Sequence, residues 1–185
     1  MSDTFQIQNY NFNDINFIRD KKNYKIYIKK GNKNCRIRLL TSILSIPFGI
    51  EKYFNKYILN LSFFNIKENN SAHNFYSVLL DIDKYFMNIK DVDTAPIDLK
   101  LLVKDKTYMS CIRETSPYPP LLRTHIKIVK NSIITKFISY NDVNLCIPED
   151  KIKNKKGYFT IELSGLWVNK DSYGLIWYLN GGKIY

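Results

Sequence analysis

Hydrophobic and polar residues alternate from Tyr24 to Lys30 (YKIYIKK), and a period of two predicts a β-strand. Ile26 and Ile28 occupy one face of this strand. The opposite face carries Lys25, Tyr27 and Lys29. The predicted strand therefore has one apolar side and one side that is basic and aromatic.

The stretch CRIRLLTS, residues 35–42, repeats the alternation after a polar turn at Gly31 and Asn32. Its inner positions are Cys35, Ile37 and Leu39, and its outer positions are Arg36 and Arg38. The two stretches together predict a hairpin whose outer side is cationic and aromatic.

One segment changes its period. In residues 71–90 the apolar positions recur at intervals of three and four, which predicts an amphipathic helix with Asn70 or Ser71 as its N-cap. The apolar face of this helix consists of Phe75, Val78, Leu79, Ile82, Tyr85, Phe86 and Ile89.

The rest of the chain predicts further strands. We expect residues 1–20 to form an irregular arm that lays its aromatic rings on the main body, residues 50–56 to form a short helix or turn, and the region of Ala95 and Pro96 to be a loop. The arm's rings are Phe5, Tyr10, Phe12 and Phe17. The predicted strands lie near 57–64, 107–113, 121–129, 132–140, 157–168 and 173–179. About eight strands and one helix in a single domain over 1–185 predict a mainly β fold, either a small antiparallel barrel or a sandwich that carries a helix.

The charge of the chain points to a polyanionic partner. There are 28 Lys and Arg against 17 Asp and Glu, a net charge of +11. Nucleic acid and anionic membrane surfaces attract such proteins, although the codon bias of an AT-rich genome also enriches lysine. No apolar run approaches the roughly 18 residues typical of a membrane span, and the N-terminus lacks the features of a secretory signal. We therefore expect an intracellular protein that does not bind membranes.

Catalytic motifs do not occur in the sequence. It has no phosphate-binding loop motif and no dinucleotide-binding glycine motif. The three cysteines are far apart, and with only two histidines they predict no zinc site. Asp81 and Asp83 diverge on a helix, so they are a poor metal site. We expect no enzymatic activity, no cofactor and no bound metal.

Basic and aromatic residues on strand faces are what single-stranded nucleic acid requires. Cations follow the phosphates, and bases stack on rings at roughly 1–3 kcal/mol each. The hairpin at 24–42 supplies both kinds of residue, and a solvated sheet face is the alternative interpretation. The strand at 121–129 adds an outer cationic set, namely Arg123, His125 and Lys127.

Two other segments carry candidate rings. In SPYPPLLR the prolines predict a stiff loop that presents Tyr118 beside Arg113 and Arg123, or that merely closes a barrel corner. In the final hairpin, a loop at 169–172 pairs Val168 with Tyr173 and places Ser164 opposite Trp177. Trp177 then lies in the core, whereas Trp167, opposite Gly174, is the candidate exposed ring.

Several motifs resemble one viral family. The segments PFGIEKY, YILNLSF, Tyr118-Pro119 with LLR, and above all GLWVNKDSYGLIWYL are similar to the single-stranded DNA-binding proteins of nucleocytoplasmic large DNA viruses, a group akin to the replication proteins of podophages. The resemblance covers patches over about residues 24–180. It implies an OB-fold barrel of about five core strands and a non-enzymatic role in coating unwound DNA. This chain ends in NGGKIY and not in the acidic tail usual in the phage proteins.

The resulting hypothesis is sequence-independent binding of single-stranded DNA in viral replication, recombination and repair, at replication sites in the cytoplasm or nucleus or packaged in the virion. RNA binding, viral replication partners, and a monomer or a homodimer all fit the sequence. The alternative is a basic structural or scaffold protein of a virion. The predicted contact residues are Lys25, Tyr27, Lys29, Arg36, Arg38, Arg113, Tyr118, Arg123, His125, Lys127 and Trp167.

Overall fold

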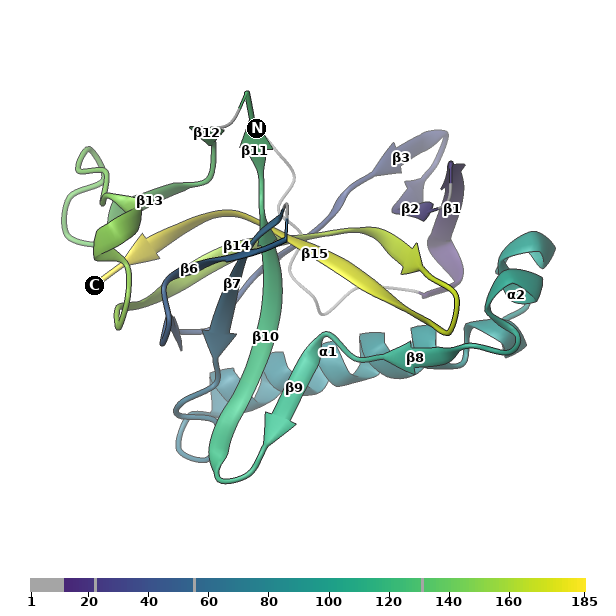
Figure 1. The fold of residues 1–185 in the computed structure, drawn as a ribbon, viewed down its shortest axis with the longest axis horizontal. Coiled ribbons are helices and arrows are strands. Elements are labelled where there is room, and N and C mark those ends of the chain that lie inside the picture. The colour runs from purple at the N-terminus through teal and green to yellow at the C-terminus, as the bar shows by residue number, and fades with distance from the viewer. Residues whose placement is uncertain (1–11, 22, 55, 131) are drawn as a thin grey trace.

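A computed structural model describes residues 12–21, 23–54, 56–130 and 132–185 (Figure 1). Strands dominate this part of the chain, so the prediction of a mainly β fold is confirmed. The helical elements are η2 (Phe12–Asp14), α1 (Asn70–Met87), η3 (Ile89–Asp91), α2 (Ile97–Val103) and η4 (Glu149–Lys151). The strands are β1 (Ile15–Asp20), β2 (Asn23–Lys30), β3 (Lys33–Cys35), β4 (Ile37–Leu40), β5 (Leu44–Ser45), β6 (Ile50–Tyr53), β7 (Lys56–Ser62), β8 (Thr107–Met109), β9 (Ile112–Thr115), β10 (Tyr118–Ile126), β11 (Ile128–Val129), β12 (Ser132–Ile133), β13 (Lys136–Ser139), β14 (Lys156–Val168) and β15 (Ser172–Ile184).

Five strand segments close into a barrel. The ring runs from β4 and β5 to β7, then to β10, β15 and β14, and β14 pairs back onto β4 and β5. Numbered along the chain, the order around the ring is 1-2-3-5-4, which is the arrangement of an OB-fold. The predicted antiparallel barrel needs one correction, because β10 and β15 run parallel. Parallel pairing joins strands distant in sequence, so local alternation carries no signal for it.

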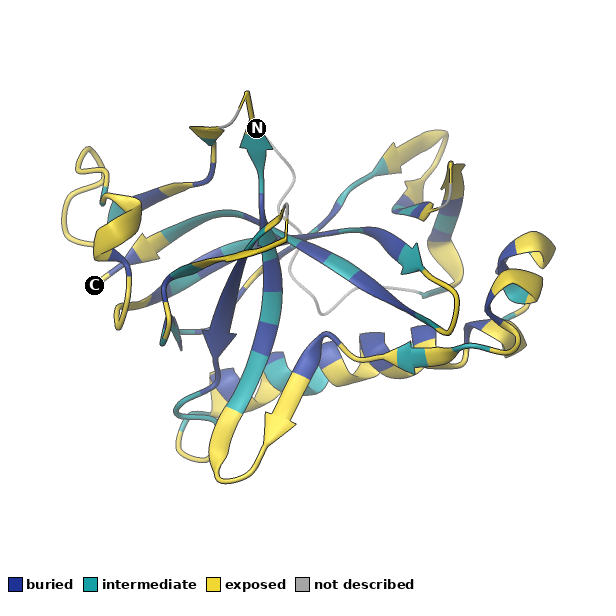
Figure 2. Cartoon of the chain, viewed as in Figure 1, coloured by how far each residue is buried: buried dark blue, intermediate teal, exposed yellow. Residues whose placement is uncertain are grey.

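Helix α1 covers the lower end of the barrel in Figure 1. Phe75, Leu79 and Phe86 of its apolar face are buried, as the period predicts. The N-cap is Asn69, one residue before the predicted pair, and its Oδ1 accepts hydrogen bonds from the backbone N–H groups of Ser71 (2.9 Å) and Ala72 (3.1 Å). Figure 2 shows that buried residues gather in the barrel and on the helix face turned toward it.

Strands β1, β2 and β3 form a wing beside the barrel. The wing joins β14 where Gly165 pairs with Lys25 and Leu166 with Tyr24. A Cβ at position 165 would lie 2.2 Å from the carbonyl oxygen of Tyr24, so only glycine permits this approach.

The predicted irregular arm is in part a strand. Residues 15–20 form β1, which pairs along β2. The rings of the arm do pack on the body, as predicted: Phe12 stacks on Tyr85 at 4.7 Å, and Phe17 meets Phe86 at 6.2 Å. Phe5 and Tyr10 lie outside the described residues.

Two short elements were assigned differently from sequence. Residues 50–53, expected as a helix or turn, form β6, because their backbone pairs with β7 from Ile50 with Leu59 to Tyr53 with Lys56. Helix α2 follows Pro96 where a loop was expected, and seven residues are too few for a clear helical period. The predicted strands at 107–113 and 132–140 are each divided in two.

The last hairpin has the predicted turn and an unpredicted bulge. Val168 pairs with Tyr173 and Trp167 with Gly174, as expected, but Leu163 rather than Ser164 lies opposite Trp177. The register shifts between Leu163 and Gly165, since the ladder here holds one extra residue on β14. Trp177 is only 1% exposed, so its predicted place in the core is confirmed.

Candidate nucleic-acid interface

Six strands bring one row of residues onto the outer side of the barrel. Each member lies opposite the next in the strand register, and on β4, β10, β14 and β15 the chain neighbours of each row member are buried. In order from β4 to β6 the row is Arg38, Glu162, Tyr178, His125, Ile58 and Glu51. Apart from the buried Ile58, charged and aromatic side chains thus cross the barrel side by side.

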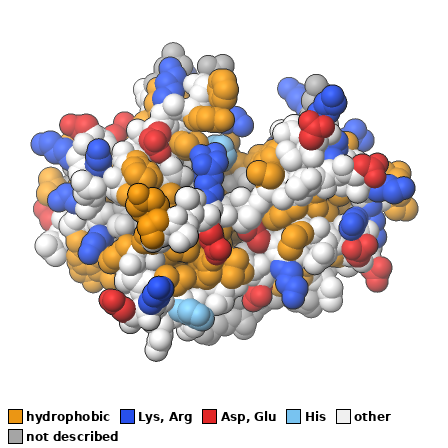
Figure 3. All heavy atoms as spheres, turned by 60° about the horizontal axis from the view of Figure 1, so that its bottom comes forward, with side chains coloured by type: hydrophobic (Ala, Val, Ile, Leu, Met, Phe, Trp, Pro, Cys, Tyr) orange, Lys and Arg blue, Asp and Glu red, His pale blue; other side chains and the backbone are white. Residues whose placement is uncertain are grey.

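Three hollows follow β10 along this side. The first, of about 290 Å³, contains Arg123 together with Arg113 and Tyr53. The second, of about 430 Å³, contains His125 and Lys127 with the side chains Lys56, Tyr57 and Tyr178. The third, of about 290 Å³, contains Lys127 again, with Arg38 and Asn180. We call these three hollows together the β10 groove; Figure 3 shows Lys or Arg and His side chains near a hollow at the upper edge of the surface.

The first hollow holds two arginines side by side. Burial and the neighbouring positive charge of Arg113 both lower the pKa of Arg123 from its ordinary value. The Cζ atom of Arg123 lies 5.7 Å from the ring centroid of Tyr53, and its buried Nε has no hydrogen-bond partner among the described residues. A buried donor without a partner is uncommon, and beside a second cation it favours an anion as ligand.

The second hollow combines a histidine, a tyrosine and a lysine. The ring centroids of His125 and Tyr178 are 5.8 Å apart, and Nζ of Lys127 lies 5.6 Å from the Tyr178 centroid. Burial, and then the charges of Lys56 and Arg123, lower the pKa of His125 to about 4. At neutral pH His125 is therefore an uncharged ring between cations.

The third hollow is organised by a buried carboxylate. Glu162 accepts hydrogen bonds from Nε of Arg38 (2.9 Å), Nδ2 of Asn180 (3.1 Å) and Nζ of Lys127 (3.4 Å). Burial opposes its ionisation, but these three donors outweigh burial, and the pKa of Glu162 lies below its ordinary value. Glu162 fixes Arg38 and Lys127 in place and cancels part of their charge.

The wing carries a smaller cationic and aromatic cluster. The Cζ atom of Arg36 lies 4.8 Å from the ring centroid of Tyr27, so the structure brings these two predicted residues together. Lys29 is exposed, whereas Lys25 pairs with Asp20 at 2.9 Å. Because exposure alternates from residue 36 to residue 39, Arg36 and Arg38 leave the same face of the chain.

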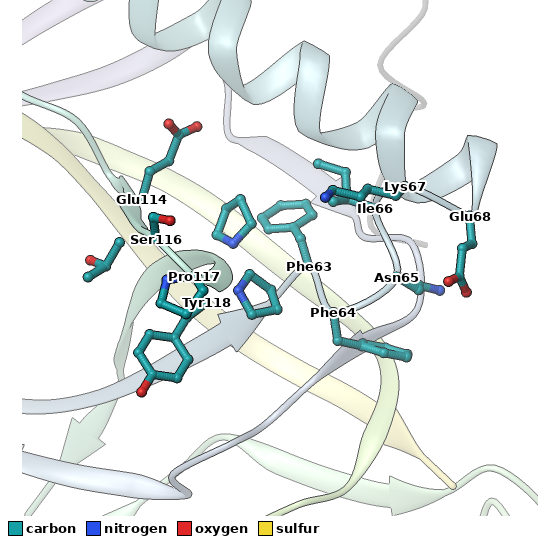
Figure 4. A pocket seen from close by; sticks show the side chains of 13 residues that line it. Phe63, Phe64, Asn65, Ile66, Lys67, Glu68, Glu114, Ser116, Pro117 and Tyr118 are labelled. Carbon is teal, nitrogen blue, oxygen red and sulfur yellow. The ribbon is translucent and has the colours of Figure 1, made fainter.

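Tyr118 and Trp167 lie apart from the groove. Tyr118 is at the tip of the β9–β10 hairpin, 72% exposed, and lines a separate hollow of about 560 Å³ with Phe63, Phe64 and prolines (Figure 4). The expectation that it lies beside Arg113 and Arg123 is wrong, because those arginines lie further along the hairpin and line the first hollow. Trp167 is partly exposed, and its ring covers Gly174, where a Cβ would come within 2.9 Å of it.

Several groove residues escaped the sequence analysis. Tyr178 follows the core residue Trp177, so alternation could have placed it outside. Tyr53 and Lys56 were missed because residues 50–56 were expected to be helical or a turn. Glu162 carries no signal, since a carboxylate in a basic protein is expected at the surface rather than buried in the centre of the site.

The fold and the groove define a class: an OB-type barrel with a cationic and aromatic groove across its strands. Among solved structures, the chain is similar to gp2.5, a single-stranded DNA-binding protein encoded by bacteriophage T7, with a TM-score of 0.43 and 6% identity over 77% of this chain and 87% of that chain. No protein-family model and no curated protein matches the sequence. Membership of the large-DNA-virus family stays a prediction.

The described residues contain no helix long and apolar enough to cross a membrane. Within the same ranges, no group of three or more His, Cys, Asp or Glu side chains is placed to hold a metal ion.

If the β10 groove holds an oligonucleotide, acid is expected to strengthen its binding through His125. A phosphate near the ring stabilises the charged imidazole, so binding takes up a proton and affinity rises as the pH falls from about 7 to about 5. The rise should be several-fold larger in the wild type than in His125→Gln, measured by fluorescence anisotropy of a labelled oligomer.

The same depressed pKa has the opposite effect on the free protein. The unfolded state takes up the proton first, at its ordinary pKa of about 6.5, so stability falls from there down to about pH 4. Thermal unfolding in the same buffers records this loss, which His125→Gln should reduce. For binding, an equal pH dependence in the wild type and in His125→Gln would argue against contact between His125 and the ligand.

Proposed function

We propose that this protein binds single-stranded nucleic acid without regard to sequence, in the β10 groove. The observation that carries the proposal is the paired Arg113 and Arg123 in the first hollow, with a buried Nε that has no partner among the described residues. Two like charges held together cost stability in the free protein, the carboxylate of Glu51 in the same hollow offsets only part of that cost, and a bound phosphate would lower it further.

The order of side chains along the groove fits a nucleic-acid strand. Cations from Arg113, Arg123, Lys56 and Lys127 can contact phosphates, while the rings of Tyr53 and Tyr178 offer faces for bases. Stacking does not depend on which base is present, so this arrangement supports binding of any sequence. In OB-folds the second and third barrel strands commonly face the ligand, and here those strands are β7 and β10.

The finer part of the proposal is the biological role. The ligand would be unwound viral DNA, coated during replication, recombination and repair at viral replication sites. This part is supported by the sequence resemblance alone.

A scaffold role remains the second candidate, on one observation. Helix α2 exposes Ile97, Leu101 and Leu102, at the right-hand end of the molecule in Figure 1. A structural subunit would bury these side chains against another protein. Substitution of Leu101 would then disrupt assembly and leave the β10 groove intact.

Binding is tested by anisotropy of a labelled thymidine oligomer over a salt series. Lys52, Lys56, Arg113 and Arg123 line the groove, and no ion pair of theirs is found in the described part of the chain. At about 0.7 released counterions per phosphate contact, log K should fall with log salt with a slope of roughly −3. Absence of binding at low salt, or an affinity that does not change with salt, contradicts the proposal.

A further inference from the structure

The tip of the β6–β7 hairpin presents an unusually exposed ring. Phe54 is 81% exposed, the highest value among the large hydrophobic side chains described. Its backbone φ is +52°, in the left-handed region that non-glycine residues rarely adopt. An apolar ring held in water on a strained turn is disfavoured in the free protein, and this is typical of a residue kept for contact with a ligand.

The ring has a support behind it. The ring centroids of Tyr53 and Phe54 are 4.8 Å apart, with an interplanar angle of 83°. The Cζ atom of Arg123 lies 5.7 Å from the ring centroid of Tyr53. Phe54 therefore contacts Tyr53, and Tyr53 in turn contacts Arg123 in the first hollow.

The position of the tip is at the rim of the groove. Tyr53, the residue before Phe54, lines the first hollow, and Lys56, two residues after it, lines the second. Phe54 itself lines neither of them. Lysines at 52 and 56 flank the ring on both sides in sequence and are exposed. The ring therefore lies at the edge of the groove, outside the two hollows that Tyr53 and Lys56 line.

We propose that Phe54 is a wedge that opens duplex nucleic acid at its junction with the single strand bound in the β10 groove. The ring inserts beneath the last base pair, Lys52 and Lys56 hold the backbones of the separating strands, and the freed strand enters the hollows. In other nucleic-acid complexes, apolar side chains inserted between base steps partly unstack them and kink the duplex. The inference rests on the proposed single-strand binding and adds strand opening to it.

The two activities predict different effects for one substitution. A ring that stacked only on the bound single strand would contribute to affinity for an oligomer. A wedge at the junction contributes to opening, because the single strand lies in the hollows that Phe54 does not line.

The test uses the full-length protein with two substrates. One is a labelled thymidine oligomer, for affinity. The other is a DNA hairpin with a thymidine tail, carrying a fluorophore and a quencher at the ends of its stem, for the rate of opening at saturating protein. The variants are Phe54→Ala and Phe54→Trp. Leu101→Ala is the matched control, because Leu101 is also an exposed apolar residue but lies on α2.

Phe54→Ala is expected to keep oligomer affinity within about twofold and to slow opening about tenfold, the effect of one lost stacking contact. Phe54→Trp should open the stem at or above the wild-type rate, and Leu101→Ala should match the wild type. Unchanged opening by Phe54→Ala overturns the wedge, and so does a loss of opening in proportion to a loss of affinity. If the wild type binds no oligomer, the proposed function fails, and the wedge fails with it.

Discussion

Replacing Arg113 and Arg123 together by alanine is expected to lower the affinity for a thymidine oligomer about a hundredfold near physiological salt. A charge-assisted hydrogen bond to phosphate contributes roughly 1.5–3 kcal/mol, which is at least about tenfold for each arginine. Loss of two phosphate contacts should also flatten the slope of log K against log salt by about 1.4. Anisotropy titrations at several salt concentrations measure both effects.

The same double substitution should leave the fold intact or stabilise it. The two guanidinium groups repel one another, and the pKa of Arg123 is lowered by burial and then by Arg113, so their removal relieves an unfavourable interaction. Lys90→Ala with Lys104→Ala is the matched control, because it removes the same net charge from exposed positions outside the groove. If the control weakened binding as much, net charge and not the groove would account for the affinity.

Arg38→Ala is expected to destabilise the protein by about 2–3 kcal/mol, whereas Arg36→Ala changes stability by less than about 0.5 kcal/mol. The difference arises because Arg38 neutralises Glu162, which is 4% exposed, while Arg36 only stacks on Tyr27. Lys127 and Asn180 still hold the carboxylate in the variant, so the loss stays below that of an isolated buried charge. Chemical denaturation of the three proteins provides the comparison.

Two controls isolate the buried charge. Glu162→Gln should recover most of the stability lost in Arg38→Ala, since the amide leaves no unpaired carboxylate. The loss should also shrink in acid, at pH values below the ordinary pKa of a glutamate. The pKa of folded Glu162 is lowered, so the stability its pairing gives is present above the ordinary value and disappears as the pH falls through the lowered one. A loss that persisted in acid would assign the effect of Arg38 to packing.

Period-two alternation was enough to place the outer cations. It put Lys25, Tyr27 and Lys29 outside on one strand and Arg123, His125 and Lys127 outside on another, and the burial pattern agrees at each position. This works because neighbouring side chains of a strand point to opposite faces whatever the strand pairs with. The turn of the last hairpin followed from the same rule.

What alternation could not predict is which strands become neighbours. Arg38 and Lys127 share one carboxylate because β14 pairs with β4 and with β15, and β15 pairs with β10, the strand that Lys127 follows. Arg38 and Glu162 are more than a hundred residues apart in the chain. Such contacts are set by closure of the barrel and not by local sequence. The placement of Tyr118 failed for the same reason, since a loop's composition does not fix the direction in which it leaves the sheet.

Strand β10 contributes Arg123 to the first hollow and His125 to the second, and Lys127, the residue directly after the strand, lines the second and third. Arg123 and His125 share one face because side chains alternate along a strand, so a shift of one residue moves them to the opposite face. The insertion or deletion of a single residue in β10 before Arg123 would turn Arg123 and His125 inward together and bring their buried neighbours to the surface. A change in the length of this strand therefore alters several groove positions at once, whereas a substitution alters only one.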